Sequence, residues 1–268
     1  RTVATRKSNT PTSNMEILRT VDDMRGWRAR LSQDIRVGFA PTMGNLHAGH
    51  VSLIHTAKAH ADLAVASIFV NPMQFGPGED LESYPRTLEV DLAKLQAAGA
   101  DAVFIPRAED IYPEGIDQHT SVDVPDLTDV LCGAQRPGHF RGVTTVVSKL
   151  LGVVRPHIAF FGAKDLQQVL VIKKMVRDLL INVEIVTVPT LRDPDGLAMS
   201  SRNGYLTPEE RALAPNFAAA LTACAPTLQN TSSDVSETID VANKALEDHG
   251  FTVGYLETRP TSDITLSQ

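Results

Sequence analysis

From residue 35 onward, short apolar runs alternate with longer segments whose apolar residues recur every three or four positions. Continuous apolar runs are typical of strands covered on both faces, and the longer segments are typical of amphipathic helices. The pattern therefore predicts an α/β fold built on a doubly wound parallel sheet with helices on both faces. The strands are expected at residues 35–40, 63–70, 102–105, 158–161 and 183–188.

Three helices are clear between these strands. The first is expected over residues 51–60. Pro85 is placed to open the second, whose apolar positions run to Leu95, and Gly99 to close it. The third is expected over residues 165–180, with Asp165 as its N-cap.

The pattern also divides the chain. Residues 1–13 contain Thr, Ser, Arg and Lys but no acid, a composition shared by transit peptides and disordered tails, and we expect a tail. Residues 14–189 carry the sheet. The pattern breaks near Pro189, so residues 190–268 are expected to form a smaller α+β domain, mainly helical with a weak strand at residues 252–256.

The composition excludes two classes of binding partner, nucleic acids and membranes. The 268 residues carry a formal charge of −7, which leaves no surplus of cations for a nucleic-acid backbone. No apolar run approaches the roughly 18 to 20 residues that cross a bilayer, so no membrane is expected. Cys132 and Cys224 form neither a close pair nor a metal-binding spacing, which indicates isolated thiols and a cytoplasmic location.

The segment with the most chemical information is residues 41–50, Pro-Thr-Met-Gly-Asn-Leu-His-Ala-Gly-His, between the first strand and the first helix. A strand, a turn and a helix N-terminus form an anion site, because unpaired backbone N–H groups and the helix dipole point at one spot. The spacing of Gly44 and Gly49 matches a phosphate loop, but His50 and Val51 replace its Lys and Ser/Thr.

Two imidazoles three residues apart, those of His47 and His50, therefore remain as the chemical feature of this turn. A dinucleotide fingerprint is absent, since no G-x-G-x-x-G occurs. Taken alone, the histidines could face a phosphate, hold a metal or lie on an ordinary surface.

Further blocks follow in order along residues 14–256. Together with the turn they resemble the nucleotidyltransferases whose first turn carries His-x-Gly-His and, within them, the pantothenate synthetase family. These blocks are Ser-Ile-Phe-Val-Asn-Pro-Met-Gln-Phe (67–75), Tyr-Pro-Arg-Thr-Leu (84–88), Arg-Pro-Gly-His-Phe-Arg-Gly-Val (136–143), Phe-Gly-Ala-Lys-Asp-Leu-Gln-Gln (161–168) and Met-Ser-Ser-Arg-Asn (199–203).

The resemblance implies a Rossmann-like nucleotide- and pantoate-binding domain with a C-terminal lid. It implies a homodimer that condenses pantoate with β-alanine through a pantoyl-adenylate, using ATP and Mg²⁺ and releasing AMP and pyrophosphate. Other nucleotidyltransferases, which keep the nucleotide in their product, and a catalytically silent nucleotide-binding homologue are the alternatives.

The resemblance also implies site residues. His47, His50, Lys164 and Arg202 are the expected catalytic residues. The ATP site is expected to comprise Met43, Gly44, Asn45, Leu46, His47, Ala48, Gly49, His50, Gly162, Ala163, Lys164, Asp165, Leu191, Met199, Ser200, Ser201 and Arg202. Each of these segments also has an ordinary interpretation, as turn chemistry, a structural Lys-Asp pair or a surface loop.

For the other ligands, Gln74 and Gln168 are expected to bind pantoate, with Gln74 also near β-alanine and with Asn71 and Tyr84 beside them. Asp91 is the expected Mg²⁺ contact, although charge on such a helix is usually a solvated face.

Two features of the resemblance stay open. The segment 136–142 either covers the substrate or serves a subunit contact. Relatives typically continue through a further strand, so the C-terminal domain is expected to be shortened or divergent, and the first residue, Arg1, is compatible with a processed form.

Overall fold

Six parallel strands form one sheet in the order β1-β4-β3-β2-β5-β6. The structure, a computed structural model, describes residues 14–229, 234–260 and 264–265. The predicted fold class is confirmed. The strands are β1 Glu16–Leu18, β2 Val37–Thr42, β3 Leu63–Ile68, β4 Ala102–Phe104, β5 Ile158–Gly162 and β6 Glu184–Val188.

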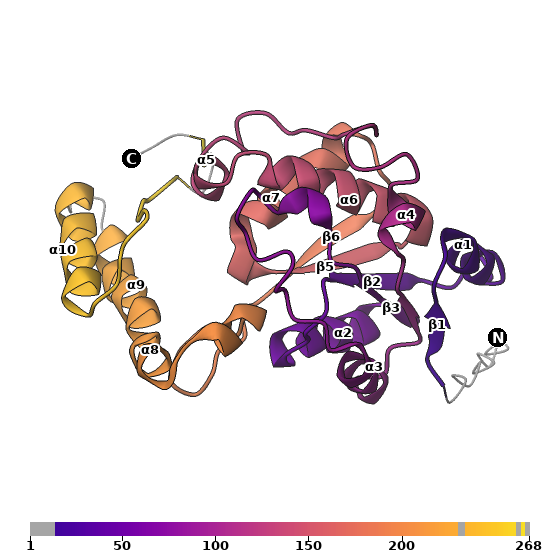
Figure 1. The fold of residues 1–268 in the computed structure, drawn as a ribbon, viewed down its shortest axis with the longest axis horizontal. Helices are drawn as coiled ribbons and strands as arrows, with labels where there is room; N and C mark the ends of the chain where they lie inside the picture. The colour runs from indigo at the N-terminus through magenta and orange to yellow at the C-terminus, as the bar shows by residue number, and fades with distance from the viewer. Residues whose placement is uncertain (1–13, 230–233, 261–263, 266–268) are drawn as a thin grey trace, which may run out of the picture.

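Helices cover both faces of this sheet (Figure 1). The α-helices are α1 Val21–Ala29, α2 Ala48–His60, α3 Leu88–Ala97, α4 Ala108–Ile111, α5 Cys132–Gln135, α6 His139–Val154, α7 Leu166–Asp178, α8 Pro208–Leu213, α9 Pro215–Leu228 and α10 Val235–Asp248. The short 3₁₀ helices are η1 Pro72–Gln74, η2 Ala163–Asp165 and η3 Ser201–Tyr205.

The core has two layers because the central strands are buried on both faces. Helices α1, α6 and α7 pack on the face that contains Phe39, and helices α2 and α3 pack on the face that contains Ala40. Both residues are fully buried in β2. This arrangement explains why the strand pattern was continuous and not alternating.

The chain reverses direction across the sheet between β2 and β5. From β2 the chain passes through α2 to β3 on one side, and from β5 it passes through α7 to β6 on the other. The turns that follow β2 and β5 therefore leave the same edge of the sheet side by side. Such a switch point at the carboxyl ends of strands is where open α/β sheets bind ligands.

The sheet domain differs from the prediction in two details. The edge strand β1 is only three residues long and was not predicted. Helix α3 begins at Leu88 and not at Pro85, because the Arg86 guanidinium donates to carbonyl oxygens of Leu81 and Tyr84 and keeps this stretch in the preceding loop.

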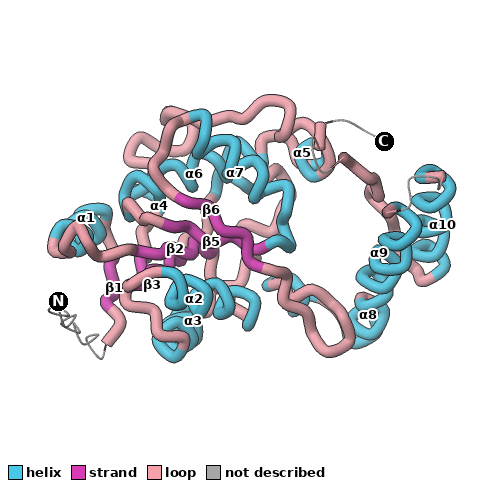
Figure 2. Tube along the Cα trace, turned by 180° about the vertical axis from the view of Figure 1, so that it is seen from behind, coloured by secondary structure: helices cyan, strands magenta, loops and turns pink. Residues whose placement is uncertain are grey.

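Helices α8, α9 and α10 lie beside the sheet domain and not on its faces (Figures 1 and 2). The strand predicted at residues 252–256 is wrong, since this stretch is irregular. Side chains anchor it instead: the Phe251 ring lies 6.5 Å from that of Phe217, and the Tyr255 hydroxyl lies 2.8 Å from Cys132 Sγ. The tail predicted at residues 1–13 lies outside the described residues.

Across the described ranges, no helix combines the length and the apolar character that crossing a membrane requires. Cys132 and Cys224 are free thiols, as predicted.

Candidate active site

The turn between β2 and α2 is held from below by a carboxylate. Gly44 and Asn45 have φ angles of 86° and 48°, so the chain reverses sharply here, a conformation that glycine adopts without strain. The backbone N–H groups of Asn45 and Leu46 each donate to the Asp91 carboxylate at 2.8 Å. Lys94 Nζ donates to the Leu46 carbonyl at 2.5 Å, so α3 fixes the turn through two side chains.

This role for Asp91 differs from both interpretations of the sequence. The residue is 1% exposed, so it is not on a solvated face. Its carboxylate already accepts the two turn N–H groups and the Thr87 hydroxyl. In this structure Asp91 positions the turn, and its Mg²⁺ contact stays a prediction.

Both histidines cap the helix that follows. Helix α2 begins at Ala48, three residues before the predicted start, with His47 as its N-cap. His47 Nδ1 accepts from the Gly49 N–H at 3.1 Å, and His50 Nδ1 accepts from the His47 N–H at 3.3 Å. The two ring centroids lie 4.1 Å apart.

These caps fix the tautomer of each ring. A nitrogen that accepts from a backbone N–H carries no proton, so the hydrogen of the neutral imidazole lies on Nε2. His47 and His50 therefore both offer an Nε2–H donor. A neutral donor suits an anionic phosphate oxygen and needs no protonation of the ring.

Position 49 of the motif requires glycine for a steric reason. A Cβ on residue 49 would lie 2.8 Å from His47 Cε1 and 2.9 Å from His47 Nδ1. Any side chain at position 49 would therefore push the His47 ring out of its capping position. The His-x-Gly-His pattern is thus one unit, in which the glycine makes room for the first imidazole.

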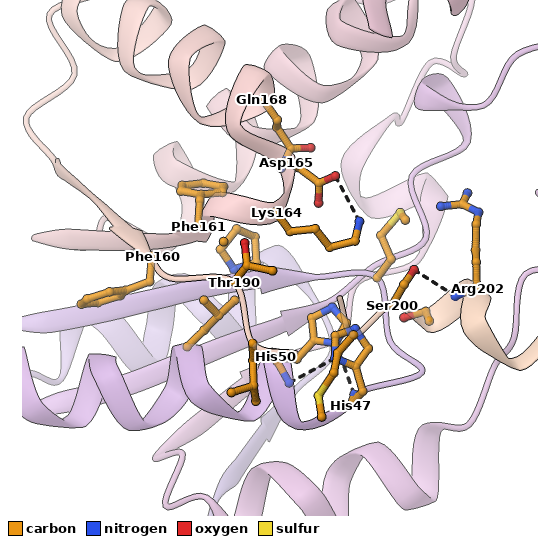
Figure 3. Close-up of a pocket in the computed structure, with 18 of the residues that line it drawn as sticks. His47, His50, Phe160, Phe161, Lys164, Asp165, Gln168, Thr190, Ser200 and Arg202 are labelled. Carbon is orange, nitrogen blue, oxygen red and sulfur yellow. Dashed lines mark hydrogen bonds and ion pairs between the residues drawn. The ribbon is translucent and has the colours of Figure 1, made fainter. Parts of the chain in front are cut away.

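The histidines line a cleft with two chambers that share part of their walls, and Figure 3 shows the first of them. The first chamber has a volume of about 190 Å³ and the second about 180 Å³. The chambers share Pro41, Met43, His50, Tyr84, Phe161, Asp165 and Gln168. Of the predicted ATP-site residues, the first chamber is lined by Met43, His47, Gly49, His50, Gly162, Lys164, Asp165, Leu191, Met199, Ser200, Ser201 and Arg202.

The predicted residues Gly44, Asn45, Leu46, Ala48 and Ala163 do not line this chamber. They supply the backbone of the turn and of η2.

Lys164 lies above the two histidines, on the neighbouring turn after β5 (Figure 3). Its ammonium group lies 3.3 Å from the Asp165 carboxylate, and its side chain is 40% exposed. Asp165 is at the N-cap position of α7, as predicted, but its side chain makes no capping hydrogen bond. Its carboxylate is paired with Lys164 instead.

Arg202 approaches from η3, on the C-terminal side of the cleft. Its guanidinium makes a two-point ion pair with the Asp80 carboxylate at 2.8 and 2.9 Å and lies 5.6 Å from the centre of the Tyr84 ring. Beside it, Ser201 Oγ donates to the Asn45 carbonyl at 3.0 Å and the Asn45 amide donates to the Ser201 carbonyl at 3.2 Å. The loop 199–205 is therefore tied directly to the turn after β2.

The second chamber is bordered by two glutamines. Gln74 and Gln168 both line it, as the resemblance implies. Gln74 Nε2 lies 3.1 Å from Met43 Sδ, and Gln74 Oε1 accepts from the Asn71 amide at 3.2 Å. The opposite wall is apolar and comes from α6, through Val143, Val146, Val147 and Leu150.

Asn71 lines the second chamber, and its amide is hydrogen-bonded within the protein. Its amide nitrogen donates to the Gly142 carbonyl at 3.0 Å as well as to Gln74, and its Oδ1 accepts from the Tyr112 hydroxyl at 2.7 Å. Asn71 is 1% exposed, and its hydrogen bond to Gln74 holds the Gln74 amide in position. A direct contact between Asn71 and the substrate stays a prediction.

Comparison with known proteins identifies the family. The family model of pantoate-beta-alanine ligase matches residues 16–267. The chain belongs to this family. A pantothenate synthetase of Shewanella amazonensis is 54% identical over 243 residues, which are 91% of this chain and 85% of the relative.

Solved structures of the family agree. The pantothenate synthetase of Thermus thermophilus superposes with a TM-score of 0.81 at 49% identity, covering 87% of this chain and 83% of that one. The ligase of Francisella tularensis, complexed with beta-gamma ATP and beta-alanine, has a TM-score of 0.76 at 38% identity, with 86% of each chain covered.

The segment 136–142 of this ligase holds the second chamber in place. Arg136 makes a two-point ion pair with Glu79 at 2.5 and 2.7 Å, and His139 Nδ1 lies 2.8 Å from the Gln74 carbonyl. A Cβ on Gly142 would lie 2.5 Å from the Met73 carbonyl oxygen, so glycine lets α6 approach η1. These contacts place the segment beside Gln74, and the choice between its two expected roles stays open.

Several contacts that hold the candidate site together were not predicted from the sequence. Asp80 and Glu79 lie in a polar loop and pair with arginines 122 and 57 positions away. Tyr112, 41 positions from Asn71, gave no signal either. Asp91 was singled out from the sequence, but its hydrogen bonds to the turn after β2 were not predicted.

The His50 imidazole is strongly biased toward its neutral form. Burial lowers its pKa to about 3, with the charges of His47, Lys164 and Lys94 adding to the effect. Burial and Lys164 also lower the pKa of His47. Between about pH 6.5 and pH 3 the unfolded chain therefore binds a proton at His50 that the folded ligase does not bind.

We expect this difference to appear as a pH dependence of stability. The contribution of His50 to the free energy of unfolding is complete above about pH 6.5 and is lost as the pH falls toward 3. The stability difference between the ligase and His50→Gln should therefore fall by up to about 1.4 kcal/mol per pH unit between about pH 6 and pH 4. Denaturant unfolding at half-unit steps measures it, and parallel curves for the two proteins would contradict it.

Proposed function

We propose that this ligase activates the carboxylate of pantoate with ATP and transfers the pantoyl group to the amine of β-alanine. The products are pantothenate, AMP and pyrophosphate. One observation carries the proposal: two imidazole Nε2–H donors and Lys164 face a chamber that opens directly into a second one bordered by Gln74 and Gln168. The proposed nucleotide site and the proposed pantoate site therefore share His50.

In the first step a carboxylate oxygen of pantoate attacks the α-phosphorus of ATP. The bond from that phosphorus to the bridging oxygen breaks, and pyrophosphate leaves with its electron pair. We assign His47, His50 and Lys164 to the charge that develops on the phosphate oxygens, since preorganised donors in a closed site act most strongly there.

Arg202 can bind the phosphate as well, provided that its guanidinium leaves the ion pair with Asp80. Its guanidinium is held by Asp80 at 2.8 Å, so a phosphate has to compete with Asp80 for it. Planar guanidinium groups bind carboxylate and phosphate in the same two-point geometry, which makes this exchange chemically direct.

In the second step the neutral amine of β-alanine attacks the acyl carbon of pantoyl-adenylate. The amide bond forms, AMP leaves, and the amine loses a proton. Neither His47 nor His50 is oriented by a carboxylate as in an acyl-transfer triad, because both Nδ1 atoms accept backbone N–H groups. We therefore assign no acyl-enzyme intermediate to this reaction.

We propose Mg²⁺ as the partner of the ATP phosphates. In the described part of the chain, no group of three or more His, Cys, Asp or Glu could form a metal site by itself. Mg²⁺ commonly keeps several waters and binds substrate phosphates with only one or two carboxylates, and Asp165 is the carboxylate that lines the first chamber. When bound, Mg²⁺ would offset phosphate charge.

We also propose that residues 190–268 form a C-terminal domain whose loop 199–205 covers the nucleotide, and that the ligase works as a cytoplasmic homodimer. The contacts of Ser201 with the turn after β2 support the covering role. The free thiols of Cys132 and Cys224 fit a reducing compartment.

The order of the two steps gives the test of this proposal. With ATP, Mg²⁺ and pantoate but no β-alanine, the ligase should catalyse exchange of labelled pyrophosphate into ATP, because the adenylate forms without the amine. Adding β-alanine should then release AMP. Exchange that strictly requires β-alanine rejects the adenylate route, and a product that retains the nucleotide would favour another nucleotidyltransferase activity.

The second chamber is tested by the same exchange. Gln74→Ala and Gln168→Ala should each weaken the pantoate dependence by roughly 1 to 3 kcal/mol, since each leaves a substrate oxygen without its hydrogen bond. ATP binding, measured directly, should change little. Normal pantoate dependence in both variants would reject this pocket.

A further inference from the structure

The amide of Asn71 can lie in only one orientation. The Gly142 carbonyl oxygen, which can only accept, lies 3.0 Å from one amide atom of Asn71. That atom is therefore the NH₂ group, and the atom that faces Tyr112 at 2.7 Å is the amide oxygen. The Tyr112 hydroxyl, in a residue that is 3% exposed, must then be the donor.

The orientation of the Asn71 amide determines that of the Gln74 amide. The second hydrogen of the Asn71 NH₂ group is directed at Gln74 Oε1, 3.2 Å away. With its oxygen held on that side, Gln74 turns its own NH₂ group toward Met43 at the wall of the second chamber. Tyr112, Asn71 and Gln74 thus form a series of hydrogen bonds with one direction, from buried hydroxyl to chamber.

We propose that Tyr112 is a positioning residue for pantoate, which acts by fixing the amide of Gln74 as a donor. The inference rests on the proposed pantoate site. It adds that the substrate atom at Gln74 must be an acceptor, a carboxylate or hydroxyl oxygen, and that Tyr112 selects for it without touching the substrate. Burial raises the pKa of Tyr112, which keeps the hydroxyl protonated as this role requires.

The Tyr112 ring also has packing contacts, which must be separated from this role. Its centroid lies 6.4 Å from that of Phe69 and 4.9 Å from that of His119, and Lys149 Nζ lies 4.2 Å from it. Tyr112→Phe keeps the ring and these contacts and removes only the hydroxyl. The amide oxygen of Asn71 then lacks its donor, and the amide is free to turn.

The experiment is pyrophosphate exchange at several pantoate concentrations without β-alanine. Tyr112→Phe should raise the KM for pantoate by about tenfold, as expected for one misdirected hydrogen bond, and leave the KM for ATP unchanged. Tyr255→Phe is the matched control, because its hydroxyl contacts Cys132 and neither residue lines either chamber. It should leave both constants at their original values.

A double mutant then separates positioning from general destabilisation. In the Gln74→Ala background, Tyr112→Phe should cause no further rise in the KM for pantoate, because its effect passes through the glutamine. A full additional tenfold loss, or a Tyr112→Phe variant with unchanged pantoate dependence, overturns the proposal. If Gln74→Ala itself keeps normal pantoate dependence, the proposed pocket fails first and takes the inference with it.

Discussion

Lys164→Ala should lower the rate of pyrophosphate exchange by on the order of 10² to 10³ while leaving the fold intact. Lys164 faces the chamber that both histidines line, and its charge lowers the pKa of each of them. A preorganised cation at this place would stabilise the negative charge that grows on the phosphate oxygens. The variant loses that charge and gains no new donor.

The fold should tolerate this change because the Lys164 side chain is 40% exposed and, among the described residues, is paired only with Asp165, in a surface ion pair of small net energy. Lys173→Ala is the matched control, since Lys173 lies on α7 with an exposed ammonium group that contacts Thr187. Equal exchange rates in the ligase and in Lys164→Ala, with circular dichroism unchanged, would remove Lys164 from the mechanism.

The sheet was predictable because its information is local. Strands β2 to β5 are short apolar runs bounded by polar turns, and their burial on both faces leaves a continuous pattern in the sequence. The edge strand β1 lacks that signal, since two of its three residues, Glu16 and Ile17, are exposed. The expected strand at residues 252–256 shows the reverse case, where an apolar pattern serves side-chain anchoring and no strand forms.

The site was predictable only where one segment carries it. The turn at residues 41–50 contains both histidines, so the sequence alone could predict that they meet at the N-terminus of α2. The groups that hold the site come from distant segments: Asp91 under the turn, Asp80 on Arg202 and Tyr112 behind Asn71. Polar residues of this kind have many ordinary uses, and only their three-dimensional partners distinguish them.

The second large effect is expected at the two histidines. His47→Ala and His50→Ala should each lower pyrophosphate exchange by about 10² or more, since each removes one Nε2–H donor from the first chamber and one cap from α2. His55→Ala is the matched control on the same helix, because the His55 side chain is exposed to solvent.

Gly49→Ala separates the donor role of the histidines from metal binding, the alternative that the motif left open. It keeps both imidazoles but places a Cβ within 2.8 Å of the His47 ring, so the ring must leave its cap and its donor is misdirected. We therefore expect Gly49→Ala to lose exchange to nearly the same extent as His47→Ala. If the pair instead held a metal, added Zn²⁺ would restore exchange in Gly49→Ala, where both ligands remain, and chelation would abolish it in the ligase. Exchange that stays low in Gly49→Ala at every Zn²⁺ concentration, and that Zn²⁺ chelation leaves unchanged in the ligase, supports direct phosphate contact by the imidazoles.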